Sequence, residues 1–585
     1  MKYTSWKQRE IDPNHLGQAM QLVSDPLFAS LLAQRGLITL EEVDDFFTPT
    51  ISSLESPWRM HGMKQATSLL LHAIQKKERI ALWGDYDVDG IVGTAILHTV
   101  LTSLTGIEPL VYFPHRVDDG YGLNKTGIDS LVEQGAKLLI TIDCGSTNHE
   151  QVTYARSQGL TVVITDHHTI HETLPDAHCI INPRQLLCTD SFDGICGATV
   201  AWKLGWALLA SHGNVQDDDT IPFLSLEQLP LVALATVADI VPLTGENRTL
   251  VSLGLKGLKH PVHLGLSALI TVAGLQEVTI TTYDIGYKIA PRLNASGRMA
   301  HAKSSFRLLT TKDPHEARLL ALKLEQLNNE RRALTDIWVE EALEQAKTQG
   351  DSKVLIVSGK HWSPGIVGLL ASRLVDTFHK PVLAIGYTGD HWVGSARSLD
   401  ALHITKALAE AKHLLLSFGG HAKAAGFSIE SKELESFSTF FCQLIDGLLD
   451  DNALIPILEY DLDVSFEAIK GSLHSALERF SPFGHENRKP LCITKGVQLI
   501  EKRKVGKDGK HVKCKFKVSD MVIDGIGFNL DKYCEESAEG TIVDVAYHLD
   551  INTWQGATTL QLHLVDMRLG TYPPLLPPYQ GDNSN

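Results

Sequence analysis

The chain has 585 residues, a formal net charge of −16, 43% hydrophobic residues and eight cysteines. This length predicts about three or four domains. The acidic balance argues against a protein that coats DNA with its whole surface, but it allows an enzyme with a local basic channel. The cysteines form no CxxC pair, which argues against a zinc ribbon or a disulfide framework and favours a reducing cytoplasm. The sequence has no run of 18 apolar residues and no apolar segment at its start, so we expect neither a membrane span nor a signal peptide.

Two regions make up the first part of the chain. Residues 1–50 are predicted to form a mainly helical extension, because residues 26–33 and 40–47 have helical spacing of apolar positions. Residues 51–265 alternate β-type and helical runs, which predicts a mostly parallel, doubly wound sheet. The predicted strands are 79–84, 109–113, 137–142 and 161–165. Their carboxyl ends would face one edge of the sheet, where ligands bind in open α/β sheets.

Acidic and imidazole side chains stand at the ends of four apolar elements in this region. Three carboxylates follow the first predicted strand, and the other groups follow later strands or the helical stretch 229–237. The residues are Asp85, Asp87 and Asp89; Asp143; Asp166, His167 and His168; and Asp239. Like charges crowded together cost free energy unless cations lie between them. Each aspartate taken alone is equally typical of a helix cap or a solvated turn.

This ligand set suits a pair of divalent ions such as Mn²⁺ or Mg²⁺, and histidine favours Mn²⁺. We interpret Asp85, Asp87, Asp89, Asp143, His167 and Asp239 as candidate metal ligands. Two such ions can bind both the attacking and the leaving oxygen of a phosphoryl displacement. The sequence therefore predicts metal-dependent phosphoryl-transfer chemistry.

The second part of the chain contains a connector, a second α/β region and a β-rich region. Residues 266–349 form the connector, and after Pro314 they contain no Gly or Pro up to residue 348. This composition predicts one helix of roughly 50 Å between two domains, and the alternative is two helices broken near Asn328. Residues 350–455 again mix strands and helices. Residues 456–570 alternate in a way that predicts a small antiparallel barrel, and residues 571–585 form a Pro- and Asn-rich tail.

A candidate phosphate clamp draws its residues from both α/β regions and from the connector. Its members are Arg116, Arg298, Ser395, Arg397, Gly419, Gly420 and His421. Arginine matches phosphate bidentately, and glycines let backbone N–H groups approach an anion closely. Arg116 could instead pair with Asp118 or Asp119, the two glycines could simply turn the chain, and Arg292 competes with Arg298.

The strongest basic run lies in the β-rich region, at residues 502–517. Alternation places Lys513, Lys515 and Lys517 on one strand face and Phe516 on the other. A basic groove with aromatic platforms is typical of proteins that bind single strands. The alternative is a solvated hairpin face with Phe516 in the barrel core.

As an ordered set, these motifs resemble the DHH phosphoesterase superfamily. The matching residues are 85–90 (Asp-Tyr-Asp-Val-Asp-Gly), 143–145 (Asp-Cys-Gly), 166–168 (Asp-His-His), 238–239 (Ala-Asp) and, for the DHH-associated domain, 419–421 (Gly-Gly-His). Residues 113–123, 291–298 and 364–373 resemble the RecJ family within it, and the likeness covers roughly residues 50 to 570. Residues 481–490 depart from the family pattern, because His-Glu-Asn-Arg-Lys replaces its usual Gly-Asn-Pro continuation.

The resemblance implies a single-stranded-DNA-specific 5′→3′ exonuclease that releases 5′-mononucleotides and acts in repair and recombination. It implies two α/β domains that flank a cleft, joined by a long helix, and a C-terminal OB-fold. It also implies that Asp143 bridges two ions, that Asp89, His167 and Asp239 complete one of them, and that Asp85 and Asp87 lie beside the other.

The resemblance further implies that His168 faces the scissile phosphate and that Asp166 orients an imidazole from behind. Single-stranded DNA, a single-strand-binding protein and a helicase are the implied partners, in the cytoplasm. Two other functions remain open: a phosphodiesterase of short oligonucleotides or cyclic dinucleotides, and a catalytically silent strand-binding protein.

Overall fold

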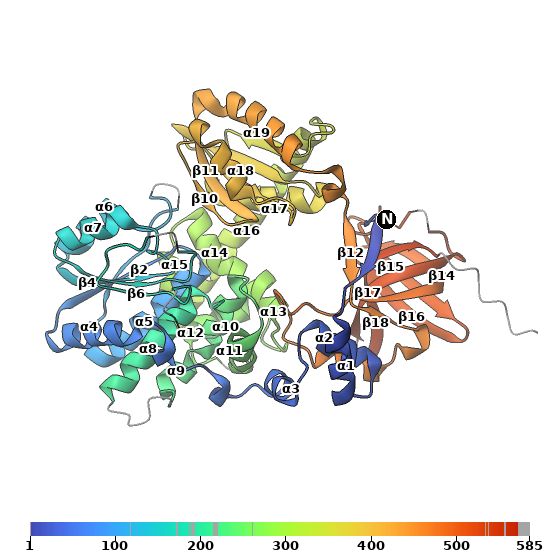
Figure 1. Ribbon diagram of the computed structural model, residues 1–585, viewed down its shortest axis with the longest axis horizontal. Helices are drawn as coiled ribbons and strands as arrows, with labels where there is room; N and C mark the ends of the chain where they lie inside the picture. The colour runs from blue at the N-terminus through green and yellow to red at the C-terminus, as the bar shows by residue number, and fades with distance from the viewer. Residues whose placement is uncertain are drawn as a thin grey trace, which may run out of the picture. The chain divides into compact units, whose positions relative to one another are not determined.

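The computed structural model describes residues 2–116, 119–170, 173–185, 188, 194–213, 220–259, 261–532, 534–535, 537–554 and 557–570. The chain divides into two compact units (Figure 1). The larger unit comprises Pro49–Leu454 and Gly484–Glu486. The smaller unit comprises Met1–Thr48, Ile455–Phe483 and Asn487–Asn585. The predicted N-terminal extension therefore belongs to the same unit as the C-terminal barrel. Local sequence patterns could not predict this association.

A five-stranded parallel sheet opens the larger unit, and it confirms the predicted doubly wound arrangement. Its strands, in spatial order, are β3 (Leu110–Tyr112), β2 (Arg79–Gly84), β4 (Ala136–Ile142), β5 (Thr161–Thr165) and β6 (Cys179–Ile181). The four predicted strands are present, and β6 is an additional strand of three residues.

Helices cover both faces of this sheet, which explains why its strands are almost continuously apolar. The helices are α4 (Met63–Gln75), α5 (Val88–Thr105) and α8 (Gly197–His212) on one face, and α6 (Lys125–Glu133) and α7 (His149–Ser157) on the other (Figure 1). Among the described helices, α5 is the one whose length and apolar composition would fit a membrane span, and 72% of it is buried inside the protein. It packs against β2 and α8 as a core helix.

A helical layer follows the sheet and ends in one long helix. Its elements are α9 (Phe223–Glu227), α10 (Leu229–Ala238), α11 (Gly245–Gly257), α12 (Leu264–Val272), α13 (Thr282–Asp284), the π-helical turn η3 (Ile285–Ile289), α14 (Ala290–Met299), α15 (Lys303–Thr310) and α16 (Pro314–Lys347). Helix α16 runs unbroken for 34 residues, so the single-helix prediction is confirmed. Asp313 caps its start, Pro314 occupies its first turn, and Asn328 is buried within it.

The second α/β region of the larger unit is a five-stranded mixed sheet. Its spatial order is β10 (Ser417–Gly420), β11 (Ala424–Glu430), β9 (His391–Arg397), β8 (Val382–Tyr387) and β7 (Leu355–Gly359). Helix α17 (Pro364–Phe378) packs with α16 against one face, and α18 (Ile404–Glu410) and α19 (Leu434–Leu448) cover the other. This arrangement confirms the expected pair of α/β domains with a long helix between them.

A closed five-stranded barrel dominates the smaller unit. Its strands are β14 (Cys492–Val505), β15 (His511–Val518), β16 (Met521–Gly527), β18 (Ala557–Leu569) and β17 (Ile542–Trp554), and β17 pairs back to β14. Beside it lie β1 (Ser5–Gln8), α1 (Pro13–Leu22), α2 (Pro26–Gln34), α3 (Leu40–Phe47), β12 (Ile457–Tyr460), β13 (Leu462–Asp463) and α20 (Gly471–Glu478). Short 3₁₀ turns elsewhere in the chain are Ile51–Ser53, Pro57–Arg59, Lys412–Leu414, Ser431–Glu433, Asp451–Leu454 and Phe466–Ala468.

Strand β15, which carries the basic residues, has one face in the barrel core and one facing outward, as predicted. Phe516 is 0% exposed in the barrel core with Val512 and Cys514, so it offers no platform for a base. Lys513 and Lys515 face outward. The predicted tail, residues 571–585, lies outside the described residues.

A buried ion pair holds α8 against the helical layer of the larger unit. Lys203 is 0% exposed, and its Nζ lies 2.9 Å from Glu246 Oε1 and 2.7 Å from the carbonyl oxygen of Glu55. Removing one partner of such a pair leaves the other charge buried without compensation.

Lys203→Ala should therefore lower the free energy of unfolding of the larger unit by about 3–5 kcal/mol. Lys347→Ala, which removes an exposed partner of Glu344, should change it by less than about 1 kcal/mol. Urea unfolding followed by circular dichroism checks both values. Equal midpoints for the two variants would contradict the importance of the buried pair.

Candidate active site

The acidic and imidazole residues meet at one edge of the parallel sheet because they follow neighbouring strands. Asp85 follows β2, Asp143 follows β4, and Asp166 follows β5. Asp239, at the end of α10, reaches the same place. Asp85, Asp143 and Asp239 border a cavity of about 300 Å³. The lining residues are Asp85, Tyr86, Asp87, Arg116, Tyr121, Asp143, His168, Ala238, Asp239, Asn294 and Arg298.

Asp87 combines the helix-cap role and the candidate ligand role. Its Oδ1 accepts hydrogen bonds from the backbone N–H groups of Asp89 (2.9 Å) and Gly90 (3.2 Å), at the start of α5. Capping the helix uses only Oδ1 of Asp87, so its Oδ2 remains available to bind a cation. Gly90 is required for a close approach, because a Cβ there would lie 2.5–2.7 Å from backbone atoms of Asp85.

Asp89 is held by the amino terminus of α8. Its two carboxylate oxygens accept hydrogen bonds from the N–H groups of Gly197 (2.6 Å) and Ala198 (2.9 Å). Helix amino termini stabilise anions through such orphan donors and through the helix dipole. A Cβ on Gly197 would lie 2.7 Å from the Asp143 Cβ, so the glycine lets α8 approach both aspartates.

His167 lies among three carboxylates without forming a hydrogen bond to any of them. Its Nε2 is 3.2 Å from Asp143 Oδ1, 3.6 Å from Asp239 Oδ2 and 3.7 Å from Asp89 Oδ2, and it is a buried nitrogen without a partner. Burial lowers the pKa of His167 to about 4, despite the opposing charge of Asp89. The imidazole is therefore neutral at pH 7, and four electron-donating atoms converge where a cation would bind them together.

The carboxylates also lack the compensation that buried charges need. Burial and the charge of Asp87 raise the pKa of Asp85, and burial and the charge of Asp89 raise the pKa of Asp143 and of Asp239. Asp85 Oδ1 and Asp143 Oδ1 are buried without a hydrogen-bond partner.

The ligand atoms form three overlapping groups, each within 4.8 Å. The groups are Asp85, Asp87 and Asp143; Asp89, His167 and Asp239; and Asp143, His167 and His168. Asp143 belongs to two of these groups, and its backbone has the strained left-handed φ of 62°. By their chemistry and their unsatisfied atoms, these residues would suit divalent cations such as Mn²⁺ or Mg²⁺.

Asp166 orients His168 rather than His167. Its Oδ1 accepts a hydrogen bond of 2.8 Å from His168 Nδ1 and one from the backbone N–H of His167, while Oδ2 accepts from the N–H of Ser146. Although burial opposes the shift, the contact with His168 holds the pKa of Asp166 below its usual range. Burial lowers the pKa of His168, but the hydrogen bond and charge of Asp166 outweigh it and raise that pKa.

Arginine side chains gather on the other side of the pocket. Arg116 and Arg298 line the pocket, and the Arg116 guanidinium stacks over the Tyr86 ring at 4.8 Å. Burial, followed by the charges of Arg116, Arg331 and Arg397, lowers the pKa of Arg298 to about 9. Such crowding of cations favours an anionic ligand.

The structure separates the two competing arginines. Arg298 lies in the pocket wall, with its Nη1 donating to the Gly365 carbonyl at 2.9 Å. Arg292 instead has its Nε 2.5 Å from Glu325 Oε2. Of the two acidic residues considered as partners of Arg116, Asp119 accepts a hydrogen bond from the backbone N–H of His115 at 2.7 Å, and Asp118 lies outside the described residues.

The remaining clamp residues come from the mixed sheet. Arg397 Nη1 donates to Ser395 Oγ at 2.9 Å, on β9. The His421 ring stacks on the His168 ring at a centroid distance of 6.0 Å, so the Gly-Gly-His turn reaches the acidic site. Gly420 has a φ of 143°, and a Cβ there would lie 2.4 Å from the Ala424 carbonyl, whereas a Cβ on Gly419 would meet open space.

Tyr121 and Asn294 line the pocket, and Arg184 acts on it through its charge, but none of the three was assigned from the sequence. The Tyr121 hydroxyl donates to the Asp143 carbonyl at 3.0 Å and lies 3.2 Å from His168 Nδ1. Asn294 Oδ1 accepts from the Val88 N–H at 3.2 Å and so holds the start of α5. Both lie within motifs used for the resemblance, so a signal existed. Arg184, whose charge acts on His167, Asp239 and His421, lies in no motif.

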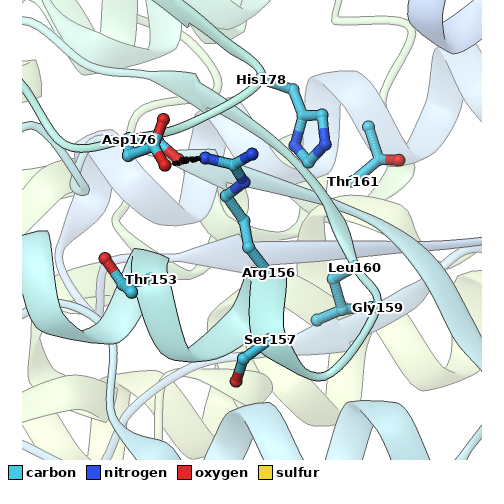
Figure 2. A pocket seen from close by; sticks show the side chains of 8 residues that line it. All are labelled: Thr153, Arg156, Ser157, Gly159, Leu160, Thr161, Asp176 and His178. Carbon is cyan, nitrogen blue, oxygen red and sulfur yellow. Dashed lines mark hydrogen bonds and ion pairs between the residues drawn. The ribbon is translucent and has the colours of Figure 1, made fainter.

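A second cavity of about 390 Å³ lies at the opposite end of β5 (Figure 2). Arg156 there forms an ion pair with Asp176, drawn as a dashed line, and His178 Nδ1 accepts from the Val162 N–H at 3.0 Å. These groups satisfy one another, so the surface lacks the uncompensated charges that distinguish the acidic site.

Comparisons with known proteins point to one family. Residues 79–236 match the DHH family N-terminal domain, residues 351–447 match the DHHA1 domain, and residues 460–566 match the RecJ OB domain. The chain is 35% identical to the single-stranded-DNA-specific exonuclease RecJ of Bacillus subtilis, over 93% of this chain and 68% of that protein. It is 32% identical to the Salmonella typhimurium protein of the same description, over 96% and 99%.

Solved structures give the same result. The structure of RecJ from Thermus thermophilus in complex with Mn²⁺ superposes with a TM-score of 0.83 at 28% identity, over 97% of this chain and 80% of that one. The complex of the same protein with Mg²⁺ gives a TM-score of 0.76. These relatives bind Mn²⁺ or Mg²⁺, the two ions expected from the sequence. The match of residues 460–566 to the RecJ OB domain agrees with the expected OB-fold.

The raised carboxyl pKa values predict how metal affinity depends on pH. A raised pKa means that the metal-free site holds protons that Mn²⁺ must displace. Affinity is therefore complete above the raised pKa values and falls as the pH decreases through them. We expect the apparent Kd for Mn²⁺ to weaken as the pH is lowered from 8, because protons then compete with the ion for these carboxylates.

Isothermal titration calorimetry in buffers of different ionisation enthalpy measures both the Kd and the protons released. Asp376→Ala, on the exposed side of α17, should reproduce the wild-type profile. A Kd that is constant from pH 6 to pH 8, without proton release, would contradict the assignment of these carboxyl groups.

Proposed function

This chain belongs to the RecJ family of the DHH phosphoesterase superfamily, and we propose that it is a single-stranded-DNA-specific exonuclease. It hydrolyses the strand from its 5′ end and releases 5′-mononucleotides. The observation that carries this proposal is that one cavity of about 300 Å³ joins an uncompensated cluster of metal-type ligands to a cluster of arginines.

The candidate metal ligands divide into two sets, and Asp143 lies next to both. Asp89, His167 and Asp239 would hold one divalent ion, and Asp85, Asp87 and Asp143 would hold the other. Asp143 Oδ1 also lies 3.2 Å from His167 Nε2 of the first set. When bound, two such ions lower the pKa of a water and neutralise charge that develops on the phosphate. The protein supplies the fixed geometry: α8 holds Asp89, and the left-handed backbone of Asp143 directs that carboxylate toward both sets.

His168 is positioned to act on the substrate phosphate. Its Nδ1 is occupied by Asp166, so its other ring nitrogen remains for a phosphate oxygen. The raised pKa of His168 favours the charged, donating form near neutral pH. A donor aimed at developing negative charge stabilises the transition state.

The arginines would bind the terminal phosphate. Arg116, Arg298 and Arg397 act on one another electrostatically, and a phosphate anion relieves that repulsion. Ser395, Gly419, Gly420 and His421 would complete the clamp with a hydroxyl, backbone donors and an imidazole. A clamp that recognises a terminal phosphate beside the metal ligands favours cleavage from the 5′ end.

The size of the cavity supports the preference for a single strand. A volume of about 300 Å³ is at the lower end for ligand pockets and suits one nucleotide rather than a base pair. In the smaller unit, the outward face of β15 would bind the backbone of the same strand through Lys513 and Lys515.

The cellular setting is part of the proposal and is supported by the family resemblance. We place the enzyme in the cytoplasm, in DNA repair and recombination, with a single-strand-binding protein and a helicase as partners. The barrel unit argues against a phosphodiesterase of short oligonucleotides, because such substrates need no extended binding track.

An end-label assay tests the activity and the metal site together. One oligonucleotide, labelled at either end, is offered as a single strand and as a duplex, with Mn²⁺, Mg²⁺ or EDTA. We expect early release of a labelled mononucleotide only from the 5′-labelled single strand, and none in EDTA. Asp143→Ala should abolish this release while retaining strand binding, because the site loses the residue shared by both ligand sets.

Other outcomes of this assay would contradict the proposal. Attack confined to molecules of a few nucleotides would assign the chain to the short-oligonucleotide class. Binding without cleavage in any metal would favour a strand-binding protein. Wild-type turnover by Asp143→Ala would remove the shared-ligand assignment.

The basic strand predicts a salt-dependent contribution to binding. Each phosphate contact on a single strand contributes about −0.7 to the slope of log K against log salt concentration. Lys513→Ala should reduce the magnitude of this slope by about that amount. Lys515→Ala should reduce it less, because Lys515 Nζ already lies 2.7 Å from Glu501 Oε2.

Fluorescence anisotropy titrations at several salt concentrations measure these slopes. Lys432→Ala, in the larger unit and paired with Glu430, should leave the slope unchanged. A wild-type slope in Lys513→Ala would show that this face does not contact the strand.

A further inference from the structure

Two exposed tyrosines stack on each other outside the pocket. The side chains of Tyr283 and Tyr287 are 62% and 73% exposed. Their ring centroids are 4.6 Å apart and the ring planes differ by 26°. Neither hydroxyl forms a hydrogen bond within the described part of the chain. Solvent-facing aromatic rings of this kind expose apolar surface that a folded protein otherwise tends to bury.

The local helix geometry creates this stack. Residues four apart lie on the same face of a helix, and here the pair extends across α13 into the π-helical turn η3. The opposite face of the turn is anchored in the core by Ile285 and Ile289, both 0% exposed. Single π-helical turns are rare and occur frequently at functional sites.

The same helical segment leads directly into the active-site wall. Turn η3 continues into α14, where Asn294 and Arg298 line the pocket. Asn294 and Arg298 lie seven and eleven positions after Tyr287, in the helix that continues from the turn. At 1.5 Å per residue, Asn294 is about 10 Å further along the axis. Helix α10, which ends at the pocket, packs against both η3 and α14.

The charges beside the pair do not repel a nucleic-acid backbone. Asp284 is neutralised by Lys288, whose Nζ lies 2.7 Å from Asp284 Oδ1. Glu325, the acidic partner across from α14, is neutralised by Arg292. The pair therefore presents ring surface in a locally neutral setting, and stacking uses only one face of each ring.

We propose that Tyr283 and Tyr287 form a stacking platform for an unpaired base of the substrate strand, close to the nucleotide held in the pocket. This inference rests on the proposed function. The offset of about 10 Å along the helix from Asn294 places the platform within a few nucleotides of the pocket. Bases in a duplex are already stacked, so the platform adds to the preference for single strands and positions the strand for cleavage.

Steady-state kinetics on a 5′-phosphorylated single strand test the platform. The double variant Tyr283→Ala/Tyr287→Ala should raise KM by about 5- to 150-fold, the range expected for loss of stacking of one base, with kcat within about twofold of wild type. The double variant Tyr283→Phe/Tyr287→Phe should behave as wild type, because stacking needs the rings and not the hydroxyls. Phe223→Ala removes another exposed aromatic side chain, on α9, and should change neither parameter.

A scan with abasic nucleotides separates stacking from a general effect on folding. In the wild type, one abasic position near the 5′ end should weaken binding, and the double alanine variant should be insensitive to that position. An unchanged KM, or the same abasic profile in both proteins, would overturn the platform and favour a protein-binding role for the pair.

Different results would contradict the platform and the exonuclease activity. A wild-type enzyme that cleaves single strands but shows no difference from the double alanine variant contradicts only the platform. An enzyme that does not cleave contradicts the proposed activity. In that case, anisotropy binding of the same abasic series in EDTA still measures stacking.

Discussion

The structure depends on one unfavourable arrangement: carboxylates and a neutral imidazole are buried together, and the nearby positive charges do not outweigh the cost of their burial. His167 Nε2 lies within 3.7 Å of three carboxylates and has no hydrogen bond. Burial and mutual repulsion raise the pKa of Asp85, Asp143 and Asp239. A protein tolerates such a cluster only where surrounding structure imposes it, and divalent ions convert the same arrangement into a favourable one.

The fold imposes this cluster through the ends of its elements. Parallel strands bring their carboxyl ends to one edge, the amino terminus of α8 fixes Asp89, and Gly197 allows the close approach. A second sheet, joined through α16, brings the Gly-Gly-His turn against His168. Cations on one side of the pocket and carboxylates on the other match a phosphodiester that lies between metal ions and arginine side chains.

The metal-ligand candidates could be predicted because they lie in short motifs directly after apolar segments. Asp85, Asp143 and Asp239 each follow an apolar run that is recognisable in the sequence. The choice between Arg292 and Arg298 could not be made, because it depends on Glu325, a partner on another helix. Phe516 is a similar case. The alternation of residues placed it on the strand face opposite the lysines, but it did not show whether that face lies in the barrel core.

Contacts between segments far apart in the chain also could not be predicted from the sequence. Strand β1 pairs with β12, and Phe28 packs against Phe480 at a centroid distance of 4.9 Å, although these segments lie at opposite ends of the chain. Short elements such as β6 give too few residues for a periodic pattern. The long helix α16 was predictable because 34 residues of strong helix formers leave no other regular structure.

The most direct test of the central claim is a crystal structure of the protein with Mn²⁺, with anomalous scattering used to locate the ions. We expect two peaks that share Asp143, one with Asp89, His167 and Asp239 and the other with Asp85 and Asp87 as ligands. A site without ions at saturating Mn²⁺, or ions bound only elsewhere, would contradict it.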